Sequence, residues 1–339
     1  MNCCIGIEGL PCELRTFDKE DFPKAEGRQL TEDERLRLAD FCAFVVGADD
    51  LGLCYRGDNL ADYARRVDTN LRNRRLERKD LLYALKAIYV VGLKAKSALE
   101  ENFGGEPWEC TEGEPDAKQV FTDFNERLTT DDKARGYLME RAPDVCRFFE
   151  NSANQDVLDA AVLRTAGEFS AVDGLKILRY YAFVRHQIGS KEGSWLMSTT
   201  TDWKATEQFT QGRRSIIVVA LCHFGSGDRD ITADSAVEEL LAGMGLPVAR
   251  GLIYPHQKEI SHFMALFSDQ IICVYERDEG IAWVNPWLFE ENITNESICK
   301  TGIPTPEYVG SQWQKRVDFR HVVFRARADG AHFFSTLQV

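Results

Sequence analysis

The hydrophobic pattern of the chain changes near Gly174, and this change limits most strongly the folds that the sequence can adopt. Before that point, apolar residues recur at helical spacing. Leu38, Cys42 and Val45 fall on one face of a predicted helix, and the segment 31–34, with Thr and Glu at its ends, has the spacing of a capping box at its start. The N-terminal part of the chain is therefore predicted to be mainly helical.

Further helices are predicted at residues 81–99, 130–149 and 155–169, and residues 103–116, rich in Gly, Pro and acidic residues, are predicted to form a linker. After Gly174 the pattern is typical of strands separated by turns. The predicted strands are Ile177–Arg185, Ser194–Thr199, Ser215–Cys222, Glu259–Leu266, Gln270–Glu276, Ile281–Trp287 and Asp318–Arg325, with helical insertions at Lys204–Gln211 and Ala233–Ala242. We predict an α+β chain with a helical region at 1–166 and a strand-rich mixed domain at 167–339.

Composition narrows the class of protein. The 339 residues are 44% hydrophobic, enough for a sizeable core, and no apolar run approaches the roughly 20 residues of a membrane helix. No secretory signal peptide is visible, and none of the ten cysteines forms a Cys-x-x-Cys pair, so we expect a reducing, cytoplasmic environment. The net charge of −13 argues against nucleic acid and anionic membranes as partners.

One basic run departs from this acidity. It consists of Arg65, Arg66, Arg72, Arg74, Arg75, Arg78 and Lys79. We interpret it as the solvated face of a helix, with a docking patch as the alternative.

Three later segments carry residues that are suited to chemistry. Arg179 and Arg185 lie in one predicted strand. Their separation is an even number of residues, so both side chains lie on the same side of that strand. Ser198 follows in a second predicted strand, and Glu259 lies in a third. A guanidinium, a hydroxyl and a carboxylate that converge fit a ligand that is anionic at one end and becomes cationic at the other, such as NAD.

The order of an arginine, an aromatic-x-x-Ser-Thr-Thr segment and Gln-x-Glu resembles the bacterial mono-ADP-ribosyltransferase toxins and effectors of the Arg-Ser-Glu class, in the Gln-x-Glu variant. The resemblance covers about 177–276. It implies an ADP-ribosyltransferase-like mixed α/β domain with two small, mainly antiparallel sheets. It also implies transfer of ADP-ribose from NAD, consumed as a substrate without a metal, to a target macromolecule.

The resemblance also implies roles for single residues. Glu259 would stabilise the electron-poor ribose, with Ser198 orienting it, and Gln257 would favour an amide or hydroxyl acceptor. Arg179 is the preferred ligand of the NAD phosphates and Arg185 the second choice. The resemblance places Thr199, Thr200 and Trp195 in the NAD-binding pocket. It assigns Tyr254 to recognition of the protein substrate.

Other sites fit less well. His256, Glu259 and His262 do not have the His-Glu-x-x-His spacing of a zinc site, and Cys222 and His223 are adjacent and would point to opposite faces of a strand. No Walker or dinucleotide fingerprint is present. We expect no metal.

The expected function is a mono-ADP-ribosyltransferase that modifies a target protein of unknown identity. Its helical region would recruit that target, bind a partner or cover the site. The alternatives are a catalytically inactive transferase-like scaffold that binds proteins, and an NAD glycohydrolase. The resemblance is compatible with action in the cytoplasm of a host or competitor cell after delivery.

Overall fold

The structure, a computed structural model, describes residues 5–19, 22, 27–93, 117–168, 184, 196–210, 212–223, 235–248, 255–263, 266–290, 294 and 297. The chain forms two compact units, each assembled from separate segments. Unit 1 consists of Met1–Ala95, Thr199–Asp228 and Ala265–Val339, and unit 2 of Lys96–Ser198 and Arg229–Met264. The chain division predicted at residues 166 and 167 stays a prediction.

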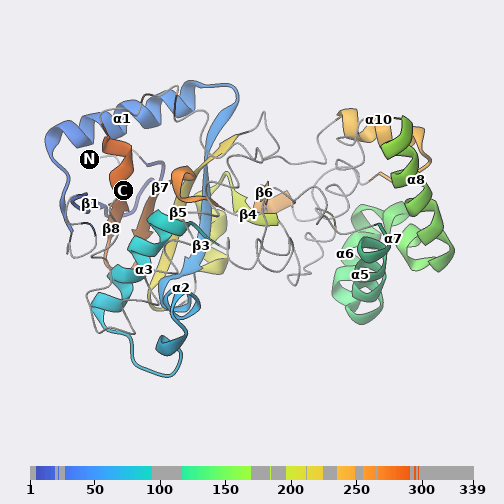
Figure 1. Ribbon diagram of the computed structural model, residues 1–339, viewed down its shortest axis with the longest axis horizontal. Helices are drawn as coiled ribbons and strands as arrows, with labels where there is room; N and C mark the ends of the chain where they lie inside the picture. The colour runs from blue at the N-terminus through green and yellow to red at the C-terminus, as the bar shows by residue number, and fades with distance from the viewer. Residues whose placement is uncertain are drawn as a thin grey trace. The chain divides into compact units, whose positions relative to one another are not determined.

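Figure 1 labels the helices of the described residues. They are α1 (Glu32–Gly47), α2 (Leu60–Val67), α3 (Arg78–Val91), α5 (Ala117–Thr130), α6 (Asp132–Arg141), α7 (Pro143–Glu150), α8 (Gln155–Glu168) and α10 (Ser235–Gly243). The strands are β1 (Glu13–Thr16), β2 (Arg28–Gln29), β3 (Leu51–Asn59), β4 (Leu196–Thr200), β5 (Ser215–His223), β6 (Glu259–Phe263), β7 (Ile271–Glu276) and β8 (Ile281–Val284).

These strands form one mixed sheet in the order β2-β1-β8-β7-β5-β3-β4-β6. β1 and β8 are parallel, whereas β3–β4, β3–β5, β5–β7 and β7–β8 are antiparallel. The mixed helix and strand content agrees with the predicted class, but the prediction of two small sheets is wrong. Isolated strand patterns do not reveal which edges pair, so a single sheet could not be told from two.

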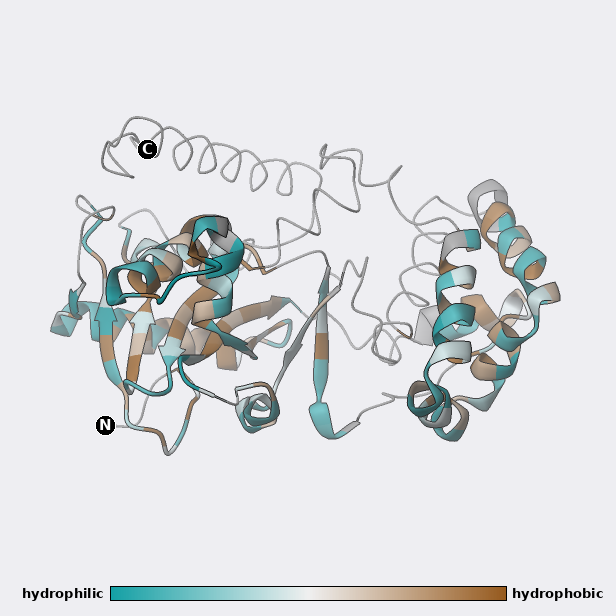
Figure 2. Ribbon diagram, turned by 90° about the horizontal axis from the view of Figure 1, so that it is seen from below, coloured by the Kyte–Doolittle hydropathy of each residue, from teal (hydrophilic) through white to brown (hydrophobic). Residues whose placement is uncertain are grey.

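In unit 1, helices cover both faces of the central strands. The apolar side chains of α1, Leu38, Phe41 and Val45, pack on Val219 and Tyr275 of β5 and β7. Side chains alternate along a strand, so the residues next to Val219 and Tyr275 in the sequence point to the opposite face of the sheet, where α3 lies. Hydrophobic residues run along the strands, as their brown colour in Figure 2 shows.

On the α3 face, a polar network is built into the core. Arg78 of α3 donates two hydrogen bonds to the buried Glu276 carboxylate, at 2.7 and 2.8 Å, and the indole Nε1 of Trp283 donates a third. Phe17 stacks on Trp283 with ring centroids 4.9 Å apart. A buried carboxylate is stable when it is paired and fully hydrogen-bonded in this way.

The start of α1 confirms the predicted capping box. The Thr31 hydroxyl accepts from the Glu34 backbone N–H, and the Glu34 carboxylate accepts from the Thr31 N–H at 2.8 Å. Arg28 also donates to both Glu34 oxygens, at 2.7 and 2.8 Å. This hydrogen bonding from Arg28 lowers the pKa of Glu34.

Glu34→Gln is therefore expected to lower the free energy of unfolding by about 1 kcal/mol at pH 7. Because the pKa is lowered on folding, this contribution is complete above the unfolded value of about 4.3 and disappears as the pH falls through the folded value. Urea unfolding of both proteins between pH 7 and pH 3 measures the difference. The exposed Glu32, in the same helical turn, supplies the control Glu32→Gln. An equal loss in that control would contradict the prediction.

Unit 2 contains a helical core. Phe124 of α5 and Phe149 of α7 stack with centroids 4.0 Å apart and an interplanar angle of 14°, and Leu138, Leu158 and Leu241 are buried in the same cluster. The predicted helices at 130–149 and 155–169 are found, the first as the pair α6 and α7. Pro143 begins α7, which fits the preference of proline for the first helical turn.

The mainly helical N-terminal region is not confirmed, because residues 1–166 also contain β1, β2 and β3. β3 was missed because its apolar residues are interrupted by Gly52 and followed by the polar run 56–59. The short helix predicted at Lys204–Gln211 is a 3-10 helix over Trp203–Phe209. Within the described part of the chain, no helix combines the length and apolar character needed to cross a membrane.

Candidate functional site

Glu259 begins β6 and is buried, with 5% of its surface exposed. Ser261 lies two residues later, on the same face of the strand, and its hydroxyl donates to Glu259 Oε1 at 3.1 Å. Ser261 and His262 are each 1% exposed. A carboxylate in such a position is shielded from water, which strengthens its interaction with a nearby positive charge.

The backbone turns sharply just before Glu259. Lys258 has a φ of 44°, in the left-handed region that side chains other than Gly rarely adopt, and Gln257 closes a 3-10 turn that starts at Pro255. Gln257 lies before the strand, which starts only at Glu259, so strand alternation does not place these two side chains on one face. Gln257 is half-buried, and its catalytic role stays a prediction.

The predicted Ser-Thr-Thr segment forms the end of β4. Ser198 is half-buried, while Thr199 and Thr200 are buried at 4% and 6% exposure. The Thr200 hydroxyl accepts from the Asp202 N–H at 3.0 Å, so this residue fixes the turn that leaves the strand. In the sheet, β4 lies between β3 and β6. In unit 2, the strand that carries Glu259 thus neighbours the strand that carries Ser198.

On the other side of β4, β3 carries one arginine, Arg56. Tyr55 of β3 pairs with Thr200, and the Tyr55 side chain belongs to the core under α1. Paired residues share a face of the sheet, so Thr200 and Ser198, two residues apart, lie on the face of Tyr55, and Arg56 lies on the opposite face. Its Nε lies 3.7 Å from Asp58 Oδ2, and its side chain is 27% exposed. Arg56 therefore does not share a face with Ser198.

Four assigned residues lie outside the described residues: Arg179, Arg185, Trp195 and Tyr254. Their roles remain predictions. Ser261 was missed, and its two-residue spacing to Glu259 is the signal that could have found it.

The described residues contain no group of three or more His, Cys, Asp or Glu side chains arranged to hold a metal ion. His262 lies in the same strand as Glu259 and is buried, whereas His256 is exposed. No protein-family model matches the chain, and no curated protein or solved structure matches it significantly. The functional assignment therefore depends on the residues themselves.

Proposed function

We propose that this chain is a mono-ADP-ribosyltransferase that moves ADP-ribose from NAD to a side chain of a target protein. The observation that carries the proposal is the pairing of two predicted segments. The buried Glu259 lies on β6, the sheet neighbour of β4, whose end is the Ser-Thr-Thr segment beginning at Ser198. Ser198 and Glu259 are distant in the sequence, and the sheet order makes their strands neighbours.

The proposed reaction breaks the bond between nicotinamide and the ribose C1′ atom. The bonding electron pair leaves with nicotinamide, and the ribose acquires oxocarbenium character. Glu259, ionised, stabilises this positive charge and accepts a hydrogen bond from a ribose hydroxyl. An acceptor atom of the target protein then bonds to C1′ and releases its proton to water. Ser198 orients the carboxylate or the ribose, and Ser261 holds the carboxylate from its own strand.

The buried surroundings of Glu259 support this role. A carboxylate on an exposed edge strand would interact with the developing charge through water, where two charges 4 Å apart attract by only about 1 kcal/mol. At 5% exposure that screening is largely removed. Ser261 supplies a hydrogen bond that helps to keep the carboxylate in one orientation before the reaction begins.

Arg179 and Arg185 remain the candidate ligands of the NAD phosphates, with Arg179 preferred. The planar donors of arginine bind phosphate oxygens in a bidentate manner that lysine does not reproduce.

Arg179→Lys is expected to raise the KM for NAD about 10-fold or more and to change kcat less, because a phosphate contact acts mainly in substrate binding. Arg147→Lys is the control, since Arg147 is an exposed arginine of unit 2 paired with Asp144. Steady-state nicotinamide release measures both. If Arg185→Lys raises the KM and Arg179→Lys does not, the phosphate ligand is the second choice, Arg185.

The proposed function is tested with NAD labelled on the adenine side and a cell lysate, using the full chain. We expect a labelled protein band together with free nicotinamide, and neither in a Glu259→Gln control. Free nicotinamide without a labelled band, in several lysates, would indicate a glycohydrolase. Absence of both free nicotinamide and a labelled band would indicate an inactive scaffold. Each of these two outcomes would contradict the proposed transfer.

A further inference from the structure

The connection between α2 and α3 presents arginines to solvent. Residues 72–75, Arg-Asn-Arg-Arg, are all exposed, and we name them the arginine loop. Figure 1 shows this connection extending beyond the ends of both helices. We propose that the arginine loop is a docking surface for an acidic segment of a protein partner. This inference concerns a separate surface from the proposed catalytic residues and does not depend on the proposed function.

The arginine loop is held firmly at both ends. Leu71 and Leu76, the residues on either side, are buried at 3% and 4% exposure. The Leu71 N–H donates to the Asp68 carbonyl at 3.0 Å, and the Arg214 guanidinium donates to the Leu76 carbonyl at 3.2 Å. The ends of the loop are thus anchored in the fold, so less conformational entropy is lost when a partner binds.

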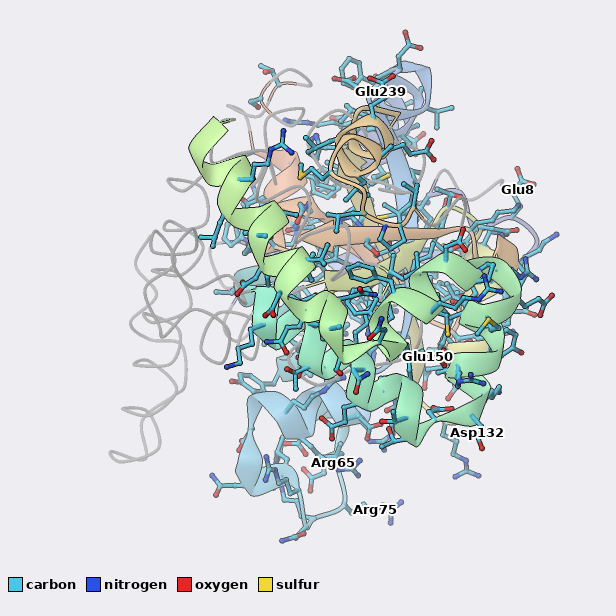
Figure 3. All side chains as sticks on the ribbon, turned by 90° about the vertical axis from the view of Figure 1, so that its right-hand side faces the viewer. Glu8, Arg65, Arg75, Asp132, Glu150 and Glu239 are labelled. Carbon is cyan, nitrogen blue, oxygen red and sulfur yellow. The ribbon has the colours of Figure 1, made fainter. Side chains whose placement is uncertain are left out.

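A second set of contacts fixes the exit of the loop into α3. The buried Asp80 accepts from the Glu77 N–H at 2.8 Å through one carboxylate oxygen and from Arg74 through the other. Arg74 therefore serves the fold. Arg72 and Arg75, by contrast, have neither an ion pair nor a side-chain hydrogen bond among the described residues. Figure 3 shows Arg75 pointing away from the ribbon.

Unlike Arg72 and Arg75, three basic side chains near the arginine loop form ion pairs with acidic residues. Arg65 pairs with Asp62 at 3.1 Å, Arg66 with Asp58 at 2.9 Å, and Lys79 with Glu77 at 2.8 Å. Over residues 65–80 there are nevertheless seven basic and only three acidic side chains, in a chain whose net charge is −13. The uncompensated positive charge is thus concentrated at Arg72 and Arg75, on the exposed loop.

Arginine in both positions favours carboxylates as the ligand groups, because a guanidinium binds a carboxylate through two parallel hydrogen bonds. Nucleic acid fits less well. Single strands bind to surfaces that combine charge with aromatic side chains, and residues 65–80 include no aromatic residue. Two aromatic rings lie close to this run, and both are buried. Tyr63, 5% exposed, lies 5.9 Å from the Arg66 guanidinium carbon, and Trp283, 1% exposed, lies 5.7 Å from that of Arg78.

Length also favours a short acidic segment. At physiological salt, charges beyond about 8 Å are largely screened, so a short peptide on the arginine loop interacts mainly with the local positive charge. A long polyanion would extend from the loop onto the acidic remainder of the molecule and be repelled there. The acidic chain as a whole therefore selects for a compact anionic partner.

Fluorescence anisotropy with the full chain and three labelled probes tests the proposal. The probes are a 12-residue peptide of Glu-Glu-Gly repeats, the same peptide with Gln in place of Glu, and a 12-nucleotide single strand. We expect the Glu peptide to bind about 10-fold or more tightly than the Gln peptide at 50 mM salt, and to weaken by about 10-fold at 500 mM salt.

The variant R72E/R75E should weaken binding of the Glu peptide by about 10-fold or more, because two attractive contacts become repulsive. R141E/R147E makes the same change in charge on exposed arginines of the helical unit and should alter binding by less than about twofold. R72K/R75K keeps the positive charge but loses the bidentate hydrogen bonding of the guanidinium, so we expect binding of the Glu peptide to weaken by about threefold. Thermal melts verify that the variants remain folded.

Absence of binding, or equal loss in R72E/R75E and R141E/R147E, would overturn the proposal. So would tighter binding of the oligonucleotide than of the Glu peptide, if R72E/R75E removed it, because the loop would then be a nucleic-acid surface. The experiment measures peptide binding alone, so its result tests the docking surface independently of NAD cleavage.

Discussion

Glu259→Gln is expected to reduce nicotinamide release from NAD by about 100- to 1000-fold. The substitution removes the negative charge that the proposed transition state requires, yet preserves the size of the side chain. The amide oxygen of Gln can still accept the hydrogen bond that Ser261 donates to Glu259 Oε1. Because a buried side chain of equal volume is retained, we expect the thermal unfolding of the variant to resemble that of the wild type.

Two matched substitutions make this result specific. Glu239, on α10 of the same unit, is exposed, and Glu239→Gln should leave the rate within about twofold. Ser261→Ala removes the hydroxyl that holds the carboxylate and should cost about 10-fold, because the charge itself remains. Full turnover by Glu259→Gln, or equal losses in Glu259→Gln and Glu239→Gln, would show that Glu259 is not the catalytic carboxylate.

Gly92→Ala should destabilise unit 1 by about 3 kcal/mol or more. Gly92 ends α3 with φ 74° and ψ −167°, a region that is essentially restricted to glycine. A Cβ atom there would lie 2.2 Å from the Leu266 carbonyl oxygen, which already accepts a hydrogen bond from the Leu93 N–H at 2.8 Å. Neither backbone segment can withdraw without breaking that bond.

Gly47→Ala is the control for this effect. Gly47 is exposed at the end of α1 in the same unit, and a Cβ atom there meets nothing within 4 Å. Because Ala has the higher helix propensity, this substitution should be neutral or stabilising by up to about 1 kcal/mol. Urea unfolding followed by tryptophan fluorescence compares both variants with the wild type. A Gly92→Ala protein as stable as the control would mean that α3 and residue 266 do not pack as described.

Sequence pattern predicted the elements whose side chains follow one clear period. β5 and β7 are continuous apolar runs and were found within a residue or two, as were α8 and α10. β3 was not found, because Gly52, Arg56, Gly57 and the residues after them break the pattern of a buried strand. Its burial comes from neighbours on both sides, which no local pattern reports.

The site shows the same limit. The position of Glu259 on a strand followed from the apolar residues after it, and the structure confirms the strand. The relation between Gln257 and Glu259 did not follow, because a left-handed Lys258 has no signature in composition or period. Residue types thus predict the proposed chemistry, whereas the pairing of distant strands decides where each candidate lies.

The parallel pairing of β1 with β8 has a consequence for synthesis of the chain. The Thr16 hydroxyl donates to the Val284 carbonyl, a contact that spans 268 positions of the sequence. A ribosome adds about 5–20 residues per second, so the first strand emerges on the order of tens of seconds before its partner exists. During that interval its open edge is available to other strands. Nascent chains stalled before residue 281 should consequently associate with holdase chaperones, and those released after residue 290 should escape them.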